Sequence, residues 1–145
     1  QFKDSTGKGM DWVESVVKYE RPDIVILDMG DKFADIRAER TDITLKAAAI
    51  HARNIAKQYD CAVVWMSQLS AEAEGRADLN QAMMEGSKTG KAAEADLMVL
   101  IGKTQQAEGE EEDPIRYLNI AKNKLNGFQG KITCQLDGSR SLYTA

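Results

Sequence analysis

Three short apolar segments constrain the fold of this chain more than any other feature. Residues 23–28 (DIVILD), 61–66 (CAVVWM) and 97–101 (LMVLI) are continuous apolar runs, without the alternation of apolar and polar residues that a half-exposed strand shows. Such runs are typical of strands buried on both faces, as in parallel sheets covered by helices. The sequence therefore predicts an α/β fold with a mainly parallel central sheet, flanking helices and right-handed crossovers.

Helical patterns separate these strands. Residues 9–20 and 43–59 carry apolar side chains at helical spacing, and a third, shorter helix is expected at 91–96. In the first helix, Asp11 is placed to act as the N-cap and Glu14 to complete a capping box. The alternation of strands and helices supports the α/β class.

The last part of the chain is predicted to be antiparallel. Three strands are expected there, at residues 115–122, 131–136 and 141–143. Asp137 and Gly138 form a turn signal between the last two strands, which predicts a C-terminal β-hairpin. No internal repeat or low-complexity linker is visible, so residues 1–145 are predicted to be a single domain.

Composition excludes several classes of protein. Hydrophobic residues make up 43% of the chain and charged residues 29%, which is typical of a soluble globular domain. No apolar run approaches the roughly 20 residues that span a bilayer, so no membrane association is expected. A net charge of -4 argues against a histone-like coat on nucleic acid, though not against a local basic channel. Cys61 and Cys134 lie in apolar segments and are predicted to be reduced, as in a cytoplasmic protein.

The segments 23–28 and 61–66 both lead into polar residues. Open α/β sheets bind ligands at the carboxyl edge of their strands, where Asp28 could hold a hydrated Mg²⁺ beside the phosphates of a nucleotide. Ser67 and Gln68 are expected at the same edge, where Gln68 could donate to a terminal phosphate or orient an attacking water. The alternatives are a turn-forming Asp and an ordinary polar residue at the start of a loop.

Two lysines, Lys122 and Lys124, occur just before a turn signal near the end of the 115–122 segment. A spacing of two residues places side chains on the same face of a strand, as expected of a cation pair directed at an anion. The alternative is a solvated edge strand, because lysines commonly protect sheet edges.

Taken in order, four segments resemble the hexameric replicative DNA helicases of the bacterial DnaB and phage primase-helicase type. The resemblance extends from about residue 20 to the end of the chain. DIVILD is similar to the Walker B strand of that family, and VVWMSQL to the motif that follows it. GSKTGKAAEADLMVLI resembles a DNA-binding loop with the next strand, and IAKNKLNGFQG resembles a strand that carries a basic finger. The resemblance implies a partial RecA-like (P-loop NTPase) domain.

The resemblance also implies roles for these residues. Asp28 would coordinate Mg²⁺ through water, and Ser67 and Gln68 would contact ATP, with Gln68 sensing its γ-phosphate. Lys122 and Lys124 would reach the ATP of a neighbouring subunit in a homo-oligomeric ring. Relatives usually carry Arg at the position of Lys124; lysine keeps the charge but loses the bidentate fork.

Two loops would provide contacts to single-stranded DNA. Basic side chains and glycine-rich backbone suit the tracking of phosphates without reading of bases. The candidates lie in residues 29–42 and 70–90 and are Lys32, Arg37, Arg40, Arg76, Ser87 and Lys88. The alternative for each basic residue is a solvated surface charge.

One central motif of such ATPases, the phosphate loop GxxxxGK[ST], does not occur in this sequence. Residues 5–9 (STGKG) have neither its spacing nor a hydroxyl residue after the lysine, and residues 86–92 (GSKTGKA) are one residue short and end in alanine. The chain is therefore predicted to be an incomplete RecA-like domain that lacks the N-terminal region with the phosphate loop. Alone, it is expected to be inactive.

The sequence thus predicts the C-terminal part of an ATP-dependent replicative helicase, which would translocate on single-stranded DNA and unwind duplex DNA at the fork. ATP and Mg²⁺ are the expected cofactors. A hexameric ring and a primase are the expected partners, in the cytoplasm of a bacterium or as a phage protein in its host. The alternatives are a fragment of a RecA/RadA- or KaiC-like ATPase, or a non-hydrolysing RecA-like assembly or binding module.

Overall fold

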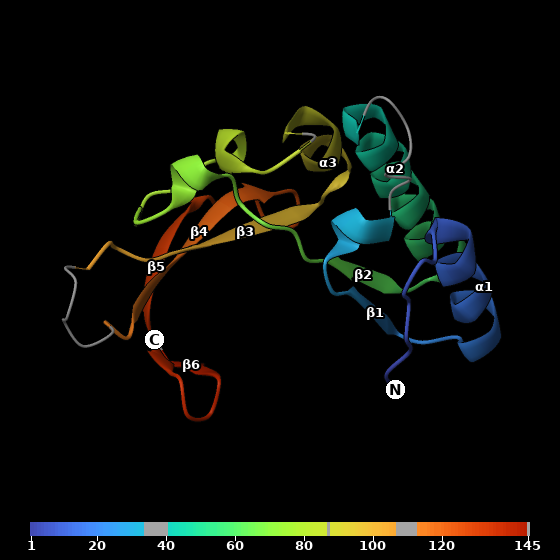
Figure 1. The fold of residues 1–145 in the computed structure, drawn as a ribbon, viewed down its shortest axis with the longest axis horizontal. Helices are drawn as coiled ribbons and strands as arrows, with labels where there is room; N and C mark the ends of the chain where they lie inside the picture. The colour runs from blue at the N-terminus through green and yellow to red at the C-terminus, as the bar shows by residue number, and fades with distance from the viewer. Residues whose placement is uncertain (34–40, 87, 107–112, 145) are drawn as a thin grey trace. The chain divides into compact units, whose positions relative to one another are not determined.

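The computed structural model describes residues 1–33, 41–86, 88–106 and 113–144. They form two compact units (Figure 1). The first comprises Gln1–Gln68 and Glu85–Glu94, and the second comprises Leu69–Met84 and Ala95–Ala145. Each unit contains its own sheet, so the prediction of one mainly parallel sheet holds only for the first unit.

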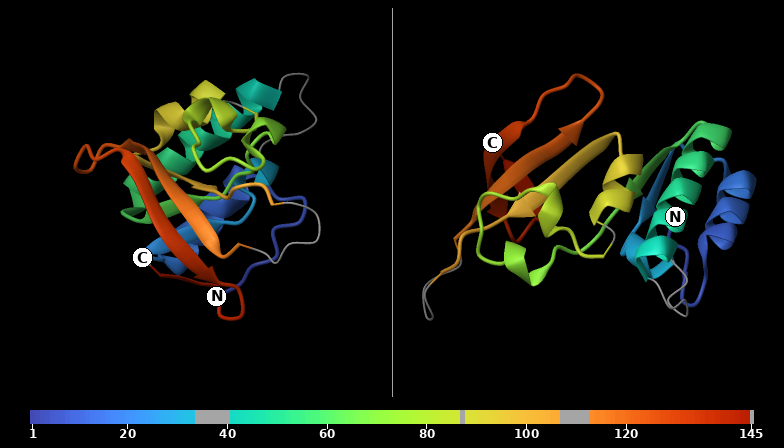
Figure 2. Two further views of the ribbon diagram at one scale, coloured as in Figure 1. Left: turned by 90° about the vertical axis from the view of Figure 1, so that its left-hand side faces the viewer. Right: turned by 90° about the horizontal axis from the view of Figure 1, so that it is seen from above.

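In the first unit, two parallel strands are covered by helices. β1 (Ile24–Leu27) pairs with β2 (Ala62–Trp65), and Leu27 lies opposite Trp65 at the end of the ladder. The helices α1 (Met10–Glu20) and α2 (Thr41–Tyr59) lie on the same side of this sheet (Figure 2). The unit is completed by a short 3-10 turn, η1 (Gly30–Phe33), and by the helix α3 (Lys88–Glu94).

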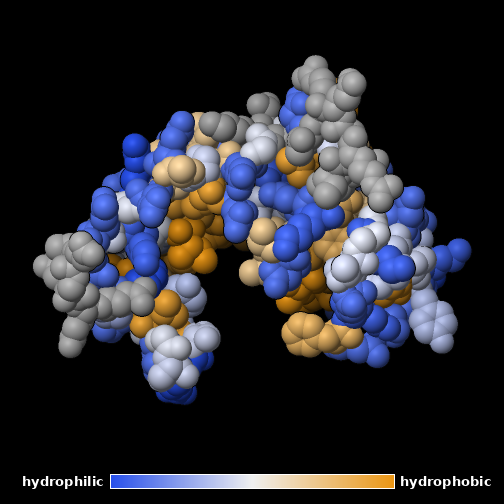
Figure 3. Space-filling model, viewed as in Figure 1, coloured by the Kyte–Doolittle hydropathy of each residue, from blue (hydrophilic) through white to orange (hydrophobic). Residues whose placement is uncertain are grey.

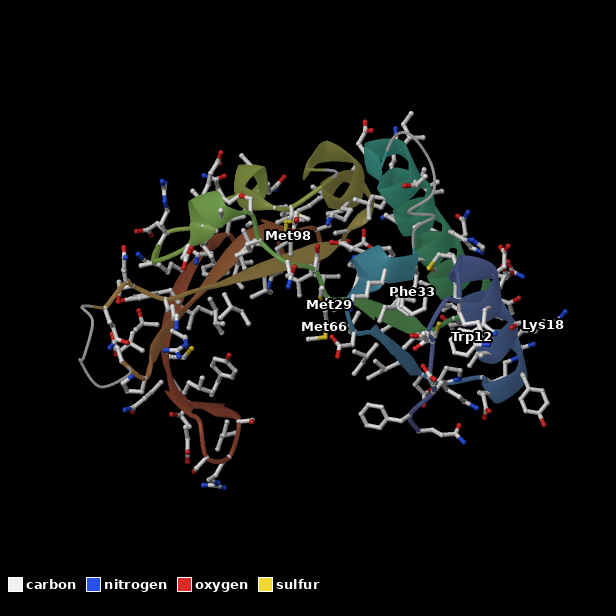
Figure 4. All side chains as sticks on the ribbon, in the orientation of Figure 1. Trp12, Lys18, Met29, Phe33, Met66 and Met98 are labelled. Atoms are coloured by element: carbon white, nitrogen blue, oxygen red, sulfur yellow. The ribbon has the colours of Figure 1, made fainter. Side chains whose placement is uncertain are left out.

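The core of the first unit lies between the sheet and the helices. Val13 and Val17 of α1 meet Leu45 and Ile55 of α2, and Leu27 closes the core from the strand. Phe33 extends it at the η1 end, and Trp12 packs against its border (Figure 4). The helical spacing of apolar residues therefore predicted the buried faces of both helices correctly.

One local prediction in this unit is wrong. The N-cap of α1 is Gly9, which makes no side-chain cap bond, and Asp11 and Glu14 do not form a capping box. Glu14 instead bonds to the helix α2: its Oε2 lies 2.7 Å from Nε2 of His51, and its Oε1 accepts a 3.1 Å bond from the Tyr59 hydroxyl. These hydrogen bonds, that of His51 above all, lower the pKa of Glu14. The carboxylate is therefore used to join the two helices.

The strands of the first unit are not buried on both faces. Ile24 and Ile26 of β1 are 61% and 64% exposed, and Val64 and Met66 are also exposed on the neighbouring segment. Apolar surface is visible near β1 and β2 in Figure 3. The prediction of two-sided burial is wrong for these strands because, among the described residues of this unit, the helices cover one face only.

The second unit is a four-stranded antiparallel sheet in the order β3-β4-β5-β6. Its strands are β3 (Leu97–Gly102), β4 (Ile115–Asn123), β5 (Gly130–Asp137) and β6 (Leu142–Thr144). The C-terminal hairpin is confirmed, with Asp137 opposite Leu142. The prediction that 97–101 joins the parallel sheet is wrong, because β3 pairs antiparallel with β4, the next strand in the chain.

The segment between Leu69 and Met84 is ordered against this second sheet. It forms two 3-10 turns, η2 (Ala71–Ala73) and η3 (Gln81–Met83). The buried Asn119 amide of β4 holds it by donating to the Ala77 carbonyl (2.9 Å) and accepting from the Leu79 N–H (3.3 Å). This part of the loop expected at 70–90 is thus held to the sheet in part by backbone hydrogen bonds to the buried Asn119 side chain.

Candidate functional site

The carboxyl ends of β1 and β2 form the candidate site. Beyond the last paired residues, the Met66 N–H donates to the Leu27 carbonyl (3.1 Å) and the Gly30 N–H donates to the Met66 carbonyl (2.8 Å). The two segments that follow β1 and β2 therefore stay hydrogen-bonded beyond the strands. Met29 and Met66 both lie at this end (Figure 4). Asp28 directly follows β1 and Ser67 is the second residue after β2, so both lie at the carboxyl end of the paired strands.

The exposure of these residues suits contact with a ligand. Asp28 and Gln68 are both exposed, whereas Ser67 is half-buried. Met29, which follows Asp28, has a φ of 56°, in the left-handed region that residues with a side chain rarely adopt. Such backbone is often found at binding sites, where surrounding structure maintains it. Here it turns the chain sharply from β1 into η1.

A polar network that the sequence did not predict lies directly beneath this edge. The carboxylate of Asp31 accepts hydrogen bonds from Trp65 Nε1 (3.0 Å) and from the Ser67 hydroxyl (2.6 Å). Lys91 of α3 donates to both oxygens of Asp31 (3.0 and 2.9 Å) and to Ser67 Oγ (2.7 Å). The Lys91 side chain is only 5% exposed. A buried ammonium needs such partners, because desolvating an unpaired charge is costly.

The network was missed for two reasons. Asp31 is one of several charged residues in the 29–42 segment, and Lys91 lies in residues 86–92, which resemble a phosphate loop only in part. One signal was available. Lys91 begins the run KAAEAD, where a lysine among alanines on a short helix indicates either exposure or a buried ion pair. The partner, 60 residues away in the chain, could not be read from spacing.

The predicted basic finger belongs to the second unit. β4 ends at Asn123, so Lys122 lies on the strand but Lys124 lies in the following turn. The argument that both lysines share one face of a strand is therefore wrong. The Lys124 side chain is 45% exposed, and its Nζ lies 3.4 Å from Asp96 Oδ1. An exposed ion pair of this length contributes little to stability, so Lys124 can exchange this partner for another anion.

The predicted DNA contacts are placed only in part. Lys32 is exposed on η1, and Arg76 is exposed after η2. Lys88 is the first residue of α3. Arg37, Arg40 and Ser87 lie outside the described residues.

Solved structures with a similar fold cover almost the whole chain. A DnaB-like replicative helicase, solved in a study of its interactions with primase, has a TM-score of 0.81 and 18% sequence identity over 98% of this chain. A second solved structure, an ATPase domain, has a TM-score of 0.78 and 17% identity over 94% of this chain. The chain has the fold of part of a DnaB-like helicase. It spans 37% of the first of those chains and 51% of the second.

Comparisons of sequence add no relative. No family model matches this chain. No curated protein sequence matches it either. The described helices include none that is both long and apolar enough to cross a membrane. The likeness is therefore one of fold.

The donor set at the edge fits a hydrated Mg²⁺ beside phosphates. Mg²⁺ prefers oxygen ligands and usually keeps several waters, so one or two carboxylates are enough when phosphates supply further oxygens. Asp28 is such a carboxylate, and it is exposed at the open end of the sheet. Among the described residues, no group of three or more His, Cys, Asp or Glu side chains is placed to hold a metal without such help.

The edge depends on a glycine next to Asp31. Gly30 is buried, and a Cβ added to it would lie 2.5–2.7 Å from three atoms of the Trp65 indole. Because the indole also bonds to Asp31, it has little freedom to move away. We expect Gly30→Ala to lower the free energy of unfolding of the 145-residue chain by about 1–3 kcal/mol, the usual cost of overpacking.

Chemical denaturation followed by circular dichroism measures this change. Gly138→Ala is the matched control, because a Cβ there meets no atom within 4 Å and should change stability little. Equal stability of the two variants would mean that the Trp65 ring can give way and that Gly30 is not required.

Proposed function

We propose that this chain is the C-terminal part of an ATP-dependent replicative DNA helicase that translocates on single-stranded DNA and unwinds duplex DNA at the fork. The observation that carries the proposal is the parallel pairing of β1 and β2, which ends with Leu27 opposite Trp65, shortly before Asp28 and Gln68 in the chain. The fold likeness to a DnaB-like replicative helicase over 98% of the chain supports it. The carboxyl edge of the strands is where open α/β sheets bind nucleotides.

We assign a different role to each polar residue at the edge. Asp28 holds the hydrated Mg²⁺, which neutralises phosphate charge when it is bound. Gln68 is also exposed, and its amide donates to the terminal phosphate or orients the attacking water. The Ser67 hydroxyl donates to Asp31, so we assign Ser67 the role of fixing the start of this segment, with the nucleotide contact made mainly by Gln68.

The second unit contributes to a neighbouring subunit. Lys122 and Lys124 reach the ATP that the adjacent subunit holds in a homo-oligomeric ring. The simplest such ring is a hexamer. Lys124 is suited to this because its bond to Asp96 is long and exposed. DNA is contacted by Lys32, Arg76 and Lys88, and by Arg37, Arg40 and Ser87.

The same likeness in fold supports a proposal for the partner protein and the cellular location. The DnaB-like neighbour was solved in a study of its interactions with primase. We extend this to a primase as the candidate partner of the present protein. The expected place of action is the cytoplasm of a bacterium, for a bacterial protein or for a phage protein in its host.

The 145-residue chain alone should neither bind ATP tightly nor hydrolyse it. Its sequence contains no phosphate loop, which normally supplies backbone N–H groups and a lysine to the β- and γ-phosphates. Titration calorimetry with Mg²⁺ and ATP on the purified chain should give no measurable heat of binding at micromolar ATP. The control is the longer protein of which we propose the chain is part, and it should bind. Micromolar affinity of the chain itself would contradict this prediction.

A further inference from the structure

Lys91 is the most buried charge of the candidate site, and its surroundings are specific. Its ammonium is held by the two oxygens of Asp31 and by Ser67 Oγ, at 2.7–3.0 Å. Ser67 in turn donates to Asp31, and Trp65 donates to the same carboxylate. The cation therefore joins α3 to the residue directly before Gln68.

Several hydrogen bonds attach α3 and the residue Glu85 before it to the rest of the first unit. Before the helix, the Glu85 N–H donates to the Gln68 carbonyl (3.3 Å). At its middle, Lys91 contacts Asp31 and Ser67. At its end, Arg53 of α2 donates to the carbonyl of Glu94. The bonds of Glu85 and Lys91 reach Gln68 and Ser67, so a displacement of α3 has to move these two residues or break the bonds.

The helix also begins with a predicted DNA contact. Lys88 is its first residue and Lys91 lies three residues on, about one helical turn away. Residues separated by one turn of a short helix move together. A displacement of the start of α3 is therefore expected to displace the Lys91 ammonium as well.

We propose that Lys91 is a positioning residue that couples DNA binding to ATP hydrolysis, by transmitting the position of α3 through Asp31 and Ser67 to Gln68. This inference rests on the proposed function. Lys91 touches neither DNA nor nucleotide in this scheme. Its ion pair is the link that lets occupancy of the DNA loop set the orientation of the Gln68 amide.

The ion pair can be dissected because its two charges can be removed together. Lys91→Met leaves the Asp31 carboxylate with the donors Trp65 and Ser67. Asp31→Asn leaves the buried ammonium with neutral oxygen acceptors only and no countercharge, which should destabilise the protein more. The double variant contains neither charge, and replacing a whole buried pair by neutral groups is often close to neutral for stability. Comparing the single and double variants therefore separates the effect on stability from the effect on coupling between DNA binding and ATP hydrolysis.

The test uses the longer protein with its phosphate loop, as wild type, Lys91→Met, Asp31→Asn and the double variant. ATP turnover is measured with and without single-stranded DNA, together with the thermal midpoint. We expect Lys91→Met to reduce the stimulation by DNA about tenfold, within the usual range of coupling between sites. The double variant should recover the thermal midpoint but not the stimulation. Lys57→Met, at an exposed lysine of α2, is the matched control and should behave as wild type.

Two other outcomes are distinguishable. If stimulation by DNA returns in the double variant together with stability, Lys91 serves the fold only and the inference is overturned. If the wild-type protein binds ATP but shows no turnover that DNA stimulates, the proposed function fails, and this inference fails with it.

Discussion

Replacement of Asp28 by asparagine is expected to abolish DNA-stimulated ATP hydrolysis by the longer protein while leaving the first unit folded. The side chain is exposed and lies outside the core, so its loss removes no packing. What it removes is the negative charge proposed to hold Mg²⁺ at the edge of the sheet. Metal stabilisation of transition-state charge is worth several kcal/mol, which corresponds to a fall in turnover of about a thousandfold or more.

Asp23→Asn is the matched control. Asp23 is an exposed aspartate that directly precedes β1, at the opposite end of the same strand. Both variants should have the circular dichroism spectrum and thermal midpoint of the wild type, and only Asp28→Asn should lose turnover. Near-normal turnover in Asp28→Asn would remove this residue from the site. A longer protein that hydrolyses no ATP even as wild type would favour the non-hydrolysing assembly module that the sequence leaves open.

Lys124→Ala is expected to lower ATP turnover far more than ATP binding. A cation supplied by a neighbouring subunit stabilises the charge that develops in the transition state and contributes less to the ground state. Trans cation fingers are worth roughly a thousandfold or more when they are arginine, and lysine should give a smaller effect because it lacks the fork. Lys124→Arg should therefore be tolerated or mildly activating. Lys131→Ala, at an exposed lysine of β5, is the control.

Mixed rings decide whether Lys124 acts across the interface. Two inactive variants, Lys124→Ala and Asp28→Asn, are combined at several ratios. Some interfaces then pair an intact Asp28 with an intact Lys124 of the neighbour, so partial ATPase activity should return. If native mass spectrometry shows mixed rings but no ratio restores turnover, Lys124 has no role across the interface. The interpretation of this lysine as a solvated residue near a sheet edge would then be preferred.

Local patterns predicted most of the elements of this fold. The strands at 24–27 and 62–65, both long helices and the C-terminal hairpin lie within or close to their predicted bounds. The direction of β3 was not predictable, because a continuous apolar run is compatible with parallel and antiparallel neighbours alike. Its pairing is set by β4, the next strand in the chain.

The candidate site was predictable only where it follows strand ends. Asp28 and Gln68 could be proposed from the sequence because parallel strands bring their carboxyl ends to one edge, which is a property of topology. The contact of Asp31 with Lys91 depends instead on how α3 packs, and no spacing in the sequence encodes it. The continuous apolar runs also indicated burial on both strand faces, whereas Ile24 and Ile26 are exposed. Sequence patterns report which residues avoid water but not which neighbour covers them.

Because Trp65 is hydrogen-bonded to Asp31, tryptophan fluorescence can report on the candidate site. The chain contains only two tryptophans, Trp12 and Trp65, and Trp65 contacts the carboxylate that holds Lys91. Indole emission responds to nearby charge and to loss of a hydrogen bond. A 145-residue chain in which Trp12 is replaced by phenylalanine would retain a single tryptophan, which bonds to Asp31 of η1 at the end of β2 and can be excited selectively over the tyrosines. Its emission would follow this contact in real time, without any attached dye.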